Sequence, residues 1–243
     1  LNVKSLTHLA YFGIDLNEDG SIKKYDKPKE KEPGWNKLNS PDFAILSRQI
    51  KILGKKLILV VRVMESDQIE TLLNREINRE NAINAIISVM AEKNFDGLNL
   101  DFEYMGYPDQ ETRDNYTKFV TDISSKCKTT NPRCEISLDV FADSAIKNRL
   151  YDLPAITKSI DILVVMTYDF FRPSSSQSGP VAPLRGKCSA LTINDDACLD
   201  YDVVTSISDI AKLIPSYKIL LGVPFYGYEW QTVDSEFLSR TYP

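Results

Sequence analysis

The sequence predicts an α/β fold in which a parallel β-sheet is covered by helices. Short apolar runs alternate with amphipathic segments along the whole chain of 243 residues. Most of these runs are apolar on both faces, as expected for strands that are buried between helices. Hydrophobic side chains make up 43% of the residues, so the chain can build a substantial core.

Three strands and two helices are predicted in the first half of the chain. Leu6–Ile14 is a β-type run, and a polar loop rich in Lys, Glu and Pro follows it. Ser40 and Pro41 begin a helix, because Ser suits the cap and Pro the first turn, and Gly54 ends it. The remaining predicted elements are strand Lys56–Val63, helix Asn81–Lys93 and strand Phe95–Glu103.

The same alternation continues in the second half. A helix through Tyr116 and Ile123 leads to further elements, which are strand Glu135–Phe141, strand Ile160–Tyr168, helix Val203–Ile214 and strand Tyr217–Pro224. A long loop at about residues 170–202 is expected to be an insertion. A doubly wound sheet and a (β/α)8 barrel both fit this order. The chain lacks G-x-G-x-x-G and G-x-x-x-x-G-K-[ST], so the commonest reason to prefer the nucleotide-binding alternative is absent.

The charge pattern excludes some partners. The formal net charge is −5, and no basic stripe could track phosphates, so no nucleic acid partner is expected. No apolar stretch reaches the roughly 18 to 20 residues that cross a bilayer. The only histidine, His8, lacks nearby Cys or carboxylate spacing, so neither a metal nor an organic cofactor is implied.

The four cysteines form two close pairs. Cys127 and Cys134 flank a short turn, and Cys188 and Cys198 bracket a polar loop, so we expect two local disulfides and an oxidising, extracellular setting. Four reduced thiols in a cytosolic enzyme are the alternative.

Candidate catalytic residues follow from the side-chain alternation of one strand. In the run Asp96–Tyr104, Asn99, Asp101 and Glu103 share one face and apolar residues share the other. In a barrel strand the polar face points inward, where ionised groups are costly unless they are paired or functional. An antiparallel edge strand with carboxylates in water is the alternative. The surrounding strand–helix rhythm favours the barrel.

Four segments resemble glycoside hydrolase family 18, the chitinase family. Phe95–Tyr104 resembles its D-G-x-D-x-D-x-E signature, with Asn99 in place of the middle aspartate. Leu6–Phe12, Val165–Asp169 and Leu221–Gly227 resemble its second, sixth and seventh strands in the same order. The resemblance covers nearly the whole chain and implies a (β/α)8 barrel of the TIM type. Tyr226–Trp230 is similar to the branch that contains spore peptidoglycan hydrolases and chitobiase-like enzymes.

The resemblance also implies a reaction. It is retaining hydrolysis of β-1,4 bonds in N-acetylglucosamine-containing glycans, such as chitin oligomers or peptidoglycan, with the substrate's acetamido oxygen as nucleophile. The implied catalytic residues are Glu103 as acid and base, Asp101 and Tyr168. The implied substrate-binding residues are Asn99, Met166, Asp169, Tyr11, Phe12, Tyr226 and Trp230. Because Asn99 cannot share a proton with Asp101, we expect a simpler coupled titration than the usual signature gives.

The chain departs from the family pattern in three places. Val60-Val61-Arg62-Val63 replaces S-x-G-G, and Arg62 either pairs with an inward carboxylate or is a surface charge at a strand end. Tyr228 stands where many chitinases carry arginine. By this resemblance, we expect the chain to begin at the second strand and to stop soon after the seventh. We therefore expect residues 1–243 to be one catalytic barrel domain and a fragment of a longer protein, the alternative being an open sheet.

Two other functions remain open at this stage. A catalytically weak or inactive glycan-binding lectin would use the same fold, although it would not need Glu103, Asp101 and Tyr168 together. A scaffold domain is the third reading, since fold alone does not fix function. The hydrolase interpretation is favoured, with secretion or association with a cell wall as the expected location.

Overall fold

The computed structural model describes residues 3–188 and 198–242 and separates into two compact units. The N-terminal unit comprises Leu1–Asp139 and Asn148–Ile162. The C-terminal unit comprises Val140–Lys147 and Leu163–Pro243. Each unit is built from parallel strands that follow the chain order, as predicted.

The N-terminal unit contains four neighbouring parallel strands in the order β1, β4, β5, β6. Their bounds are β1 (His8–Asp15), β4 (Lys56–Val63), β5 (Gly97–Phe102) and β6 (Glu135–Phe141), the last of which runs on into the other unit. A short antiparallel hairpin, β2 (Tyr25–Lys27) and β3 (Glu30–Lys31), lies in the loop predicted after the first strand. Because parallel neighbours need a crossover, a helix-containing segment separates each successive pair of these four strands.

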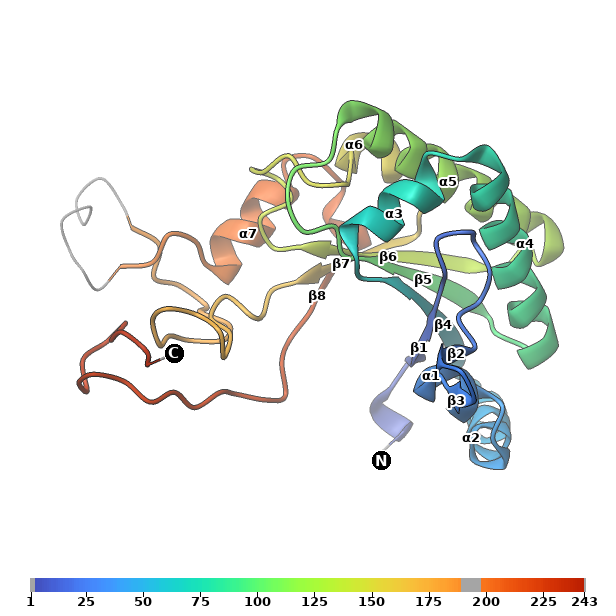
Figure 1. Cartoon of the computed structure of the whole chain (residues 1–243), viewed down its shortest axis with the longest axis horizontal. Coiled ribbons are helices and arrows are strands. Elements are labelled where there is room, and N and C mark those ends of the chain that lie inside the picture. Colours follow the sequence, from blue (N-terminus) through green and yellow to red (C-terminus); the bar gives the residue numbers. More distant parts are fainter. Residues whose placement is uncertain (1–2, 189–197, 243) are drawn as a thin grey trace. The chain divides into compact units, whose positions relative to one another are not determined.

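The helices of this unit cover the strands. They are α1 (Pro33–Leu38), α2 (Pro41–Ile52), α3 (Ser66–Leu73), α4 (Glu76–Lys93), α5 (Gln110–Thr130) and α6 (Leu153–Ile156), with a 3-10 turn η1 (Val3–Ser5) before β1. Figure 1 shows α3, α4 and α5 side by side above β4 and β5. Side-chain caps define several helix starts: Ser40 accepts a hydrogen bond from the Phe43 amide, and Asp109 accepts one from the Thr112 amide.

The apolar face of β5 forms the centre of the core. Leu98, Leu100 and Phe102 are fully buried. The Phe102 ring lies 5.5 Å from the Tyr116 ring and 5.6 Å from the Phe119 ring of α5, measured between centroids. Burying a side chain of this size contributes roughly 1.5 to 3 kcal/mol. Because side chains alternate along a strand, the polar residues of β5 point to the opposite side of the sheet.

The C-terminal unit contains β7 (Ile162–Met166) and β8 (Ile219–Leu221), which pair in parallel. Helix α7 (Val203–Ile210) and the 3-10 turn η2 (Ser216–Lys218) connect them. Asp202 caps α7 by accepting a hydrogen bond from the Thr205 amide at 2.7 Å. The Ser206 hydroxyl of α7 donates to the Ala142 carbonyl oxygen at 2.7 Å, which ties the helix to the first segment of this unit.

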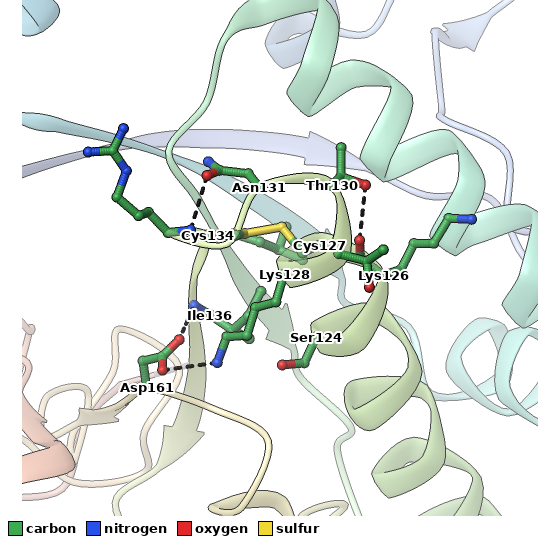
Figure 2. Close-up of a disulfide and its surroundings, with 12 residues drawn as sticks. Ser124, Lys126, Cys127, Lys128, Thr130, Asn131, Cys134, Ile136 and Asp161 are labelled. Carbon is green, nitrogen blue, oxygen red and sulfur yellow. Dashed lines mark hydrogen bonds and ion pairs between the residues drawn. A yellow bond between two sulfur atoms is a disulfide. The ribbon is translucent and has the colours of Figure 1, made fainter.

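Both predicted disulfides are confirmed. Cys127–Cys134 joins the last turns of α5 to the residue before β6, with the two Cα atoms 6.0 Å apart (Figure 2). Beside it, Asp161 pairs with Lys128 at 3.1 Å and accepts a hydrogen bond from the Ile136 amide at 2.9 Å. These contacts fix where β6 starts.

Cys188–Cys198 closes the second pair with a Cα separation of 4.9 Å. Residues 189–197 of the predicted insertion lie outside the described residues. The prediction that residues 1–243 form one domain with an insertion stays a prediction.

The sequence analysis misplaced several element boundaries and missed three short helices. Helix α4 begins at Glu76 rather than Asn81, and β7 and β8 are shorter than predicted. Helices α1, α3 and α6 were not predicted, since each spans at most eight residues and so offers too short a pattern to read. No helix in the described ranges combines the length and apolar composition of a bilayer-crossing segment.

Candidate active site

The polar face of β5 presents a buried acidic group at the carboxyl end of the strand. Asn99 is 5% exposed and Asp101 is 2% exposed. Glu103 follows directly after the strand and is half-buried, and its amide donates to the Val63 carbonyl oxygen at 3.0 Å. The side-chain parity read from the sequence is therefore confirmed for this strand. The predicted acid, Glu103, lies at the strand end where folds of this kind carry their active sites.

Asp139 on β6 completes this acidic group, and the sequence analysis missed it. The Asn99 side-chain amide donates to an Asp139 carboxylate oxygen at 2.8 Å and to the Ser137 hydroxyl at 3.0 Å. The signal was available, because Ser137 and Asp139 alternate with apolar residues in the same parity as Asn99 and Asp101. We call Asp101, Glu103 and Asp139 the acidic cluster.

Two members of the acidic cluster, Asp101 and Asp139, hold their protons tightly. Burial raises the pKa of Asp101 to about 8, with further contributions from the negative charges of Asp139 and Glu103. Burial raises the pKa of Asp139 to about 7, although the hydrogen bond from Asn99 acts in the opposite direction. Asp139 thus supplies from the neighbouring strand a second carboxylate that Asn99 does not, and the expected simpler titration of Asp101 stays a prediction.

Two buried acceptors of the site have no hydrogen-bond donor within the described part of the chain. They are Oδ1 of Asp101 and Oδ1 of Asn99. The Tyr116 hydroxyl, buried on the α5 side, is also unpaired there. Buried polar atoms almost always have a partner, so a ligand N–H or O–H group is a chemically suitable donor for these oxygens. Asp101 can therefore accept a hydrogen bond from a bound amide.

Arg62 on β4 points into the same site, which decides between the two sequence interpretations of this residue. Its Nε donates to an Asp15 carboxylate oxygen at 2.8 Å, and Nη2 lies 2.7 Å from the same oxygen. The positive charge of Arg62 lowers the pKa of Asp101 against the larger effects that raise it. Arg62 therefore pairs with a carboxylate of the site and is not an isolated surface charge.

Tyr11 and Phe12, both predicted substrate contacts, have different surroundings. The Tyr11 hydroxyl donates to the Gly34 carbonyl oxygen at 2.6 Å, and its ring meets the Phe43 ring edge-on at 4.9 Å. Burial raises the pKa of Tyr11 to about 12. The Phe12 ring is 63% exposed and lies 4.8 Å from the Arg62 guanidinium carbon. Phe12 thus borders the site, whereas Tyr11 anchors α1.

A second group of predicted residues lies in the C-terminal unit, after β7. Met166 is buried at the end of the strand. Asp169 adopts a left-handed backbone with φ of 58°. One Asp169 carboxylate oxygen accepts hydrogen bonds from the Tyr226 hydroxyl at 2.7 Å and the Tyr228 hydroxyl at 3.0 Å. Tyr228 therefore takes part in the hydrogen bonding around a predicted site residue, which its position in the sequence alone did not show.

Four aromatic side chains form a continuous row in this unit. Successive ring centroids are 6.4, 5.4 and 6.0 Å apart, in the order Tyr168, Tyr226, Tyr228 and Trp230. The Trp230 indole N–H donates to the Arg172 carbonyl oxygen at 2.9 Å, which fixes the end of the row. We call these four residues the aromatic row.

Gly222, which follows β8, leaves room for Tyr168, the first ring of the aromatic row. A Cβ atom at this position would lie 2.9 Å from the Tyr168 ring and 2.7 Å from the Val165 carbonyl oxygen. Both contacts are too short for a side chain, so only glycine lets the Tyr168 ring pack against this backbone.

The structure therefore brings the predicted residues together in two groups. The N-terminal unit joins Asn99, Asp101 and Glu103 and adds Asp139 and Arg62. The C-terminal unit joins Met166, Tyr168, Asp169, Tyr226 and Trp230 and adds Tyr228. Across the described ranges, no cluster of three or more His, Cys, Asp or Glu side chains is arranged to hold a metal ion.

Carboxylates at the carboxyl ends of parallel strands are an arrangement found in glycoside hydrolases on (β/α) barrels. The chain belongs to family 18 of the glycosyl hydrolases, whose family model matches residues 1–241. The resemblance seen in the sequence is confirmed.

Individual relatives agree with this assignment. A probable chitinase 2 from Drosophila melanogaster is 26% identical over 240 residues, covering 96% of this chain and 47% of the relative. A putative sporulation-specific glycosylase, YdhD, from Bacillus subtilis is 26% identical over 163 residues, covering 67% and 34%. The chain thus spans less than half the length of these two relatives. The expected likeness to the spore branch is confirmed.

A solved structure supports the fold. The class V chitinase from Nicotiana tobaccum, in complex with NAG4, superimposes with a TM-score of 0.76 at 18% identity, covering 99% of this chain and 69% of that one. The predicted fold class, a (β/α) barrel of the TIM type, is confirmed by this likeness.

Proposed function

We propose that this protein hydrolyses β-1,4 glycosidic bonds in N-acetylglucosamine-containing glycans, with retention of configuration. The observation that carries the proposal is the arrangement of Glu103 at the end of β5, next to the buried Asp101, whose Oδ1 has no donor in the described residues. Family membership and the chitinase and glycosylase relatives support the same reaction class.

In the first proposed step, the glycosidic C–O bond breaks and Glu103 gives its proton to the leaving oxygen. The substrate's acetamido oxygen forms a bond to the same anomeric carbon, which yields a cyclic oxazolinium ion and spares a protein nucleophile. In the second step, water attacks this carbon, its proton returns to Glu103, and the ring opens to the free sugar. Two inversions at one carbon give net retention.

Asp101 is proposed to bind the acetamido N–H through its unpaired oxygen and to stabilise the cationic ring. The raised pKa of Asp101 describes the site before a cationic ring forms in it, with the charge of Arg62 already acting to lower that pKa. A cation developing beside Asp101 favours its ionised form and so lowers that pKa during the reaction. The protein therefore gains an attraction in the transition state that the ground state lacks, which is the requirement for catalysis.

The residues of the C-terminal unit are proposed to bind the sugar. The Tyr168 hydroxyl would donate a hydrogen bond to the acetamido oxygen, and Met166 and Asp169 would shape the pocket. The aromatic row offers ring faces on which sugars stack, with Tyr226 and Trp230 as the proposed contacts. Asn99, Tyr11 and Phe12 are further proposed contacts. The two disulfides support a secreted or cell-wall location.

The test is hydrolysis of a fluorogenic chitobioside and of N-acetylglucosamine oligomers by the longest natural form of the protein. Glu103→Gln should lower turnover by at least about 100-fold, because the amide cannot donate or accept the catalytic proton. Glu80→Gln, an exposed position on α4, is the matched control and should leave turnover unchanged.

The outcomes separate the competing functions. If the natural protein binds the oligomers without cutting them, the lectin interpretation replaces the enzyme. Full activity in Glu103→Gln would remove Glu103 from its proposed role. Hydrolysis of peptidoglycan in preference to chitin oligomers would assign the substrate to the bacterial cell wall.

A further inference from the structure

We propose that Arg62 is a positioning residue that holds a fixed positive charge inside the active site, where it opposes the acidic cluster. For its catalytic meaning this inference rests on the proposed hydrolase function. The effect of the Arg62 charge on the acidic cluster is a property of the folded protein and can be measured without substrate turnover.

Strand register places Arg62 between two carboxylates. Asp15 on β1 is the register partner of Arg62 on β4, and Arg62 is the register partner of Asp101 on β5. Residues at one register level of adjacent parallel strands point to the same face of the sheet, with the strands about 4.8 Å apart. The three side chains therefore form one row across the strands, with the Arg62 cation between the carboxyl groups of Asp15 and Asp101.

The guanidinium of Arg62 is held in place from several sides. Nε and Nη2 contact the same Asp15 oxygen at 2.8 and 2.7 Å. The exposed Phe12 ring stacks on the guanidinium, whose Nη2 also lies 3.9 Å from a Glu32 carboxylate oxygen. Glu32 is itself fixed, because it accepts hydrogen bonds from the Gly34 and Trp35 amides at the start of α1. With a side chain only 21% exposed, Arg62 cannot easily turn away from the site.

The guanidinium group of arginine stays positively charged in proteins, so Arg62 supplies a fixed charge. The titratable groups of the N-terminal unit that face this charge or Asp101 come from every neighbouring element. They are Tyr11, Asp15, Glu32, Asp101, Glu103, Tyr116, Asp139 and Tyr151. Among these neighbours, Arg62 is the one whose positive charge lowers the pKa of Asp101.

The two members of the Asp15–Arg62 ion pair act on Asp101 with opposite signs. The Arg62 charge lowers the pKa of Asp101, and the Asp15 charge raises it. Removing Arg62 must therefore raise the Asp101 pKa, and neutralising Asp15 must lower it. A purely structural ion pair predicts something different: both substitutions break the same contact and should act alike.

The experiment is a carboxyl titration by NMR with ¹³C-labelled aspartate. Asp101→Asn identifies the Asp101 signal by its loss. In Arg62→Gln the Asp101 midpoint should move up by about one pH unit, a tenfold change in proton affinity, and in Asp15→Asn it should move down. Arg62→Lys retains the charge and should stay near the wild-type midpoint. Ile45→Ala, an exposed position on α2, controls for nonspecific changes.

Midpoints that move in the same direction in both variants, or that do not move, would overturn the proposal. If Arg62→Gln fails to fold, the downward shift in Asp15→Asn and the retained midpoint in Arg62→Lys still test it. Hydrolysis is measured on the same samples across pH. Absent turnover with opposite midpoint shifts rejects the proposed function and keeps the role of Arg62. Turnover without opposite midpoint shifts keeps the proposed function and rejects the role of Arg62.

Discussion

The acidic cluster and the aromatic row are built by different means. Asp101 and Asp139 come from adjacent strands, β5 and β6, Asp101 being almost entirely buried and Asp139 partly exposed, so register and desolvation control their charge. The aromatic row extends from the end of β7 into the segment after β8 and is partly exposed, and its rings are arranged around one carboxylate, Asp169. The first region suits proton transfer, and the second suits contact with a neutral sugar surface.

This difference between the two regions predicts where single substitutions should have strong effects. In a buried cluster, one carboxylate changes the charge state of its neighbours, because few water molecules screen it. In an exposed row, each hydroxyl competes with water for the same hydrogen bond, so its net contribution is small. Removing a group from the cluster should therefore change the chemistry, whereas removing one from the row should change binding.

The largest effect is expected for Asp101→Asn. Losing the carboxylate that stabilises the cationic ring should lower kcat/KM on chitin oligomers by roughly 100- to 1000-fold, while oligomer binding changes little. Steady-state kinetics and titration calorimetry measure the two separately. Loss of binding in step with turnover would contradict the division between the two regions.

Asp101→Asn should also alter stability, with a sign set by its raised pKa. The pKa is about 8 in the folded protein and near 4 in the unfolded chain. The folded state therefore binds more protons between about pH 4 and pH 8, so the free energy of unfolding falls as pH rises through this window. Asparagine does not titrate. The melting temperature of the variant minus that of the wild type should increase from pH 4 to pH 8. A constant difference would show that Asp101 ionises normally.

A smaller effect is expected for Asn99→Asp. The change removes the amide that donates to Asp139 at 2.8 Å and places a carboxyl group there. The pKa of Asp139 should rise above its value of about 7, so the pH profile of hydrolysis should shift by about one unit. Asn99→Ser removes the donor without adding charge and separates the two causes. An unchanged profile in Asn99→Asp would show that Asp139 does not couple to catalysis.

The smallest effect is expected for Tyr228→Phe. Asp169 loses one of two phenolic donors and keeps the Tyr226 hydroxyl, while the aromatic ring remains. We expect a rise in KM of about two- to fivefold with kcat nearly unchanged, because an exposed hydrogen bond contributes little to binding. Tyr217→Phe, a well-exposed position in the same unit, is the control. A large fall in kcat would place Tyr228 in the chemistry and break the comparison.

Much of the fold could be predicted from local pattern. Strand β6 was predicted with its observed bounds, and Ser40 and Pro41 marked the start of α2. The alternation along β5 indicated that Asn99 and Asp101 face inward, and the cysteine spacing indicated both disulfides. These features depend on residues that are near one another in the chain, so a local reading suffices.

The site was only partly predictable. Asp139 has the correct parity, yet its partnership with Asn99 depends on how β6 aligns with β5. The role of Tyr228 depends on a hydrogen bond to a residue 59 positions earlier. Neither relation is encoded in the spacing of nearby residues, so pattern alone could not reveal it.

By itself, the sequence determined the alternation of strands and helices, the polar face of β5, and membership of family 18, because these depend on periodicity and on short motifs. Only the tertiary structure decided that Arg62 pairs with Asp15, that Asp139 joins Asp101, and that both carboxyl groups have raised pKa values. The physical reason is that a charge responds to burial and to neighbours a few ångströms away in space, and in this protein those neighbours lie on other strands.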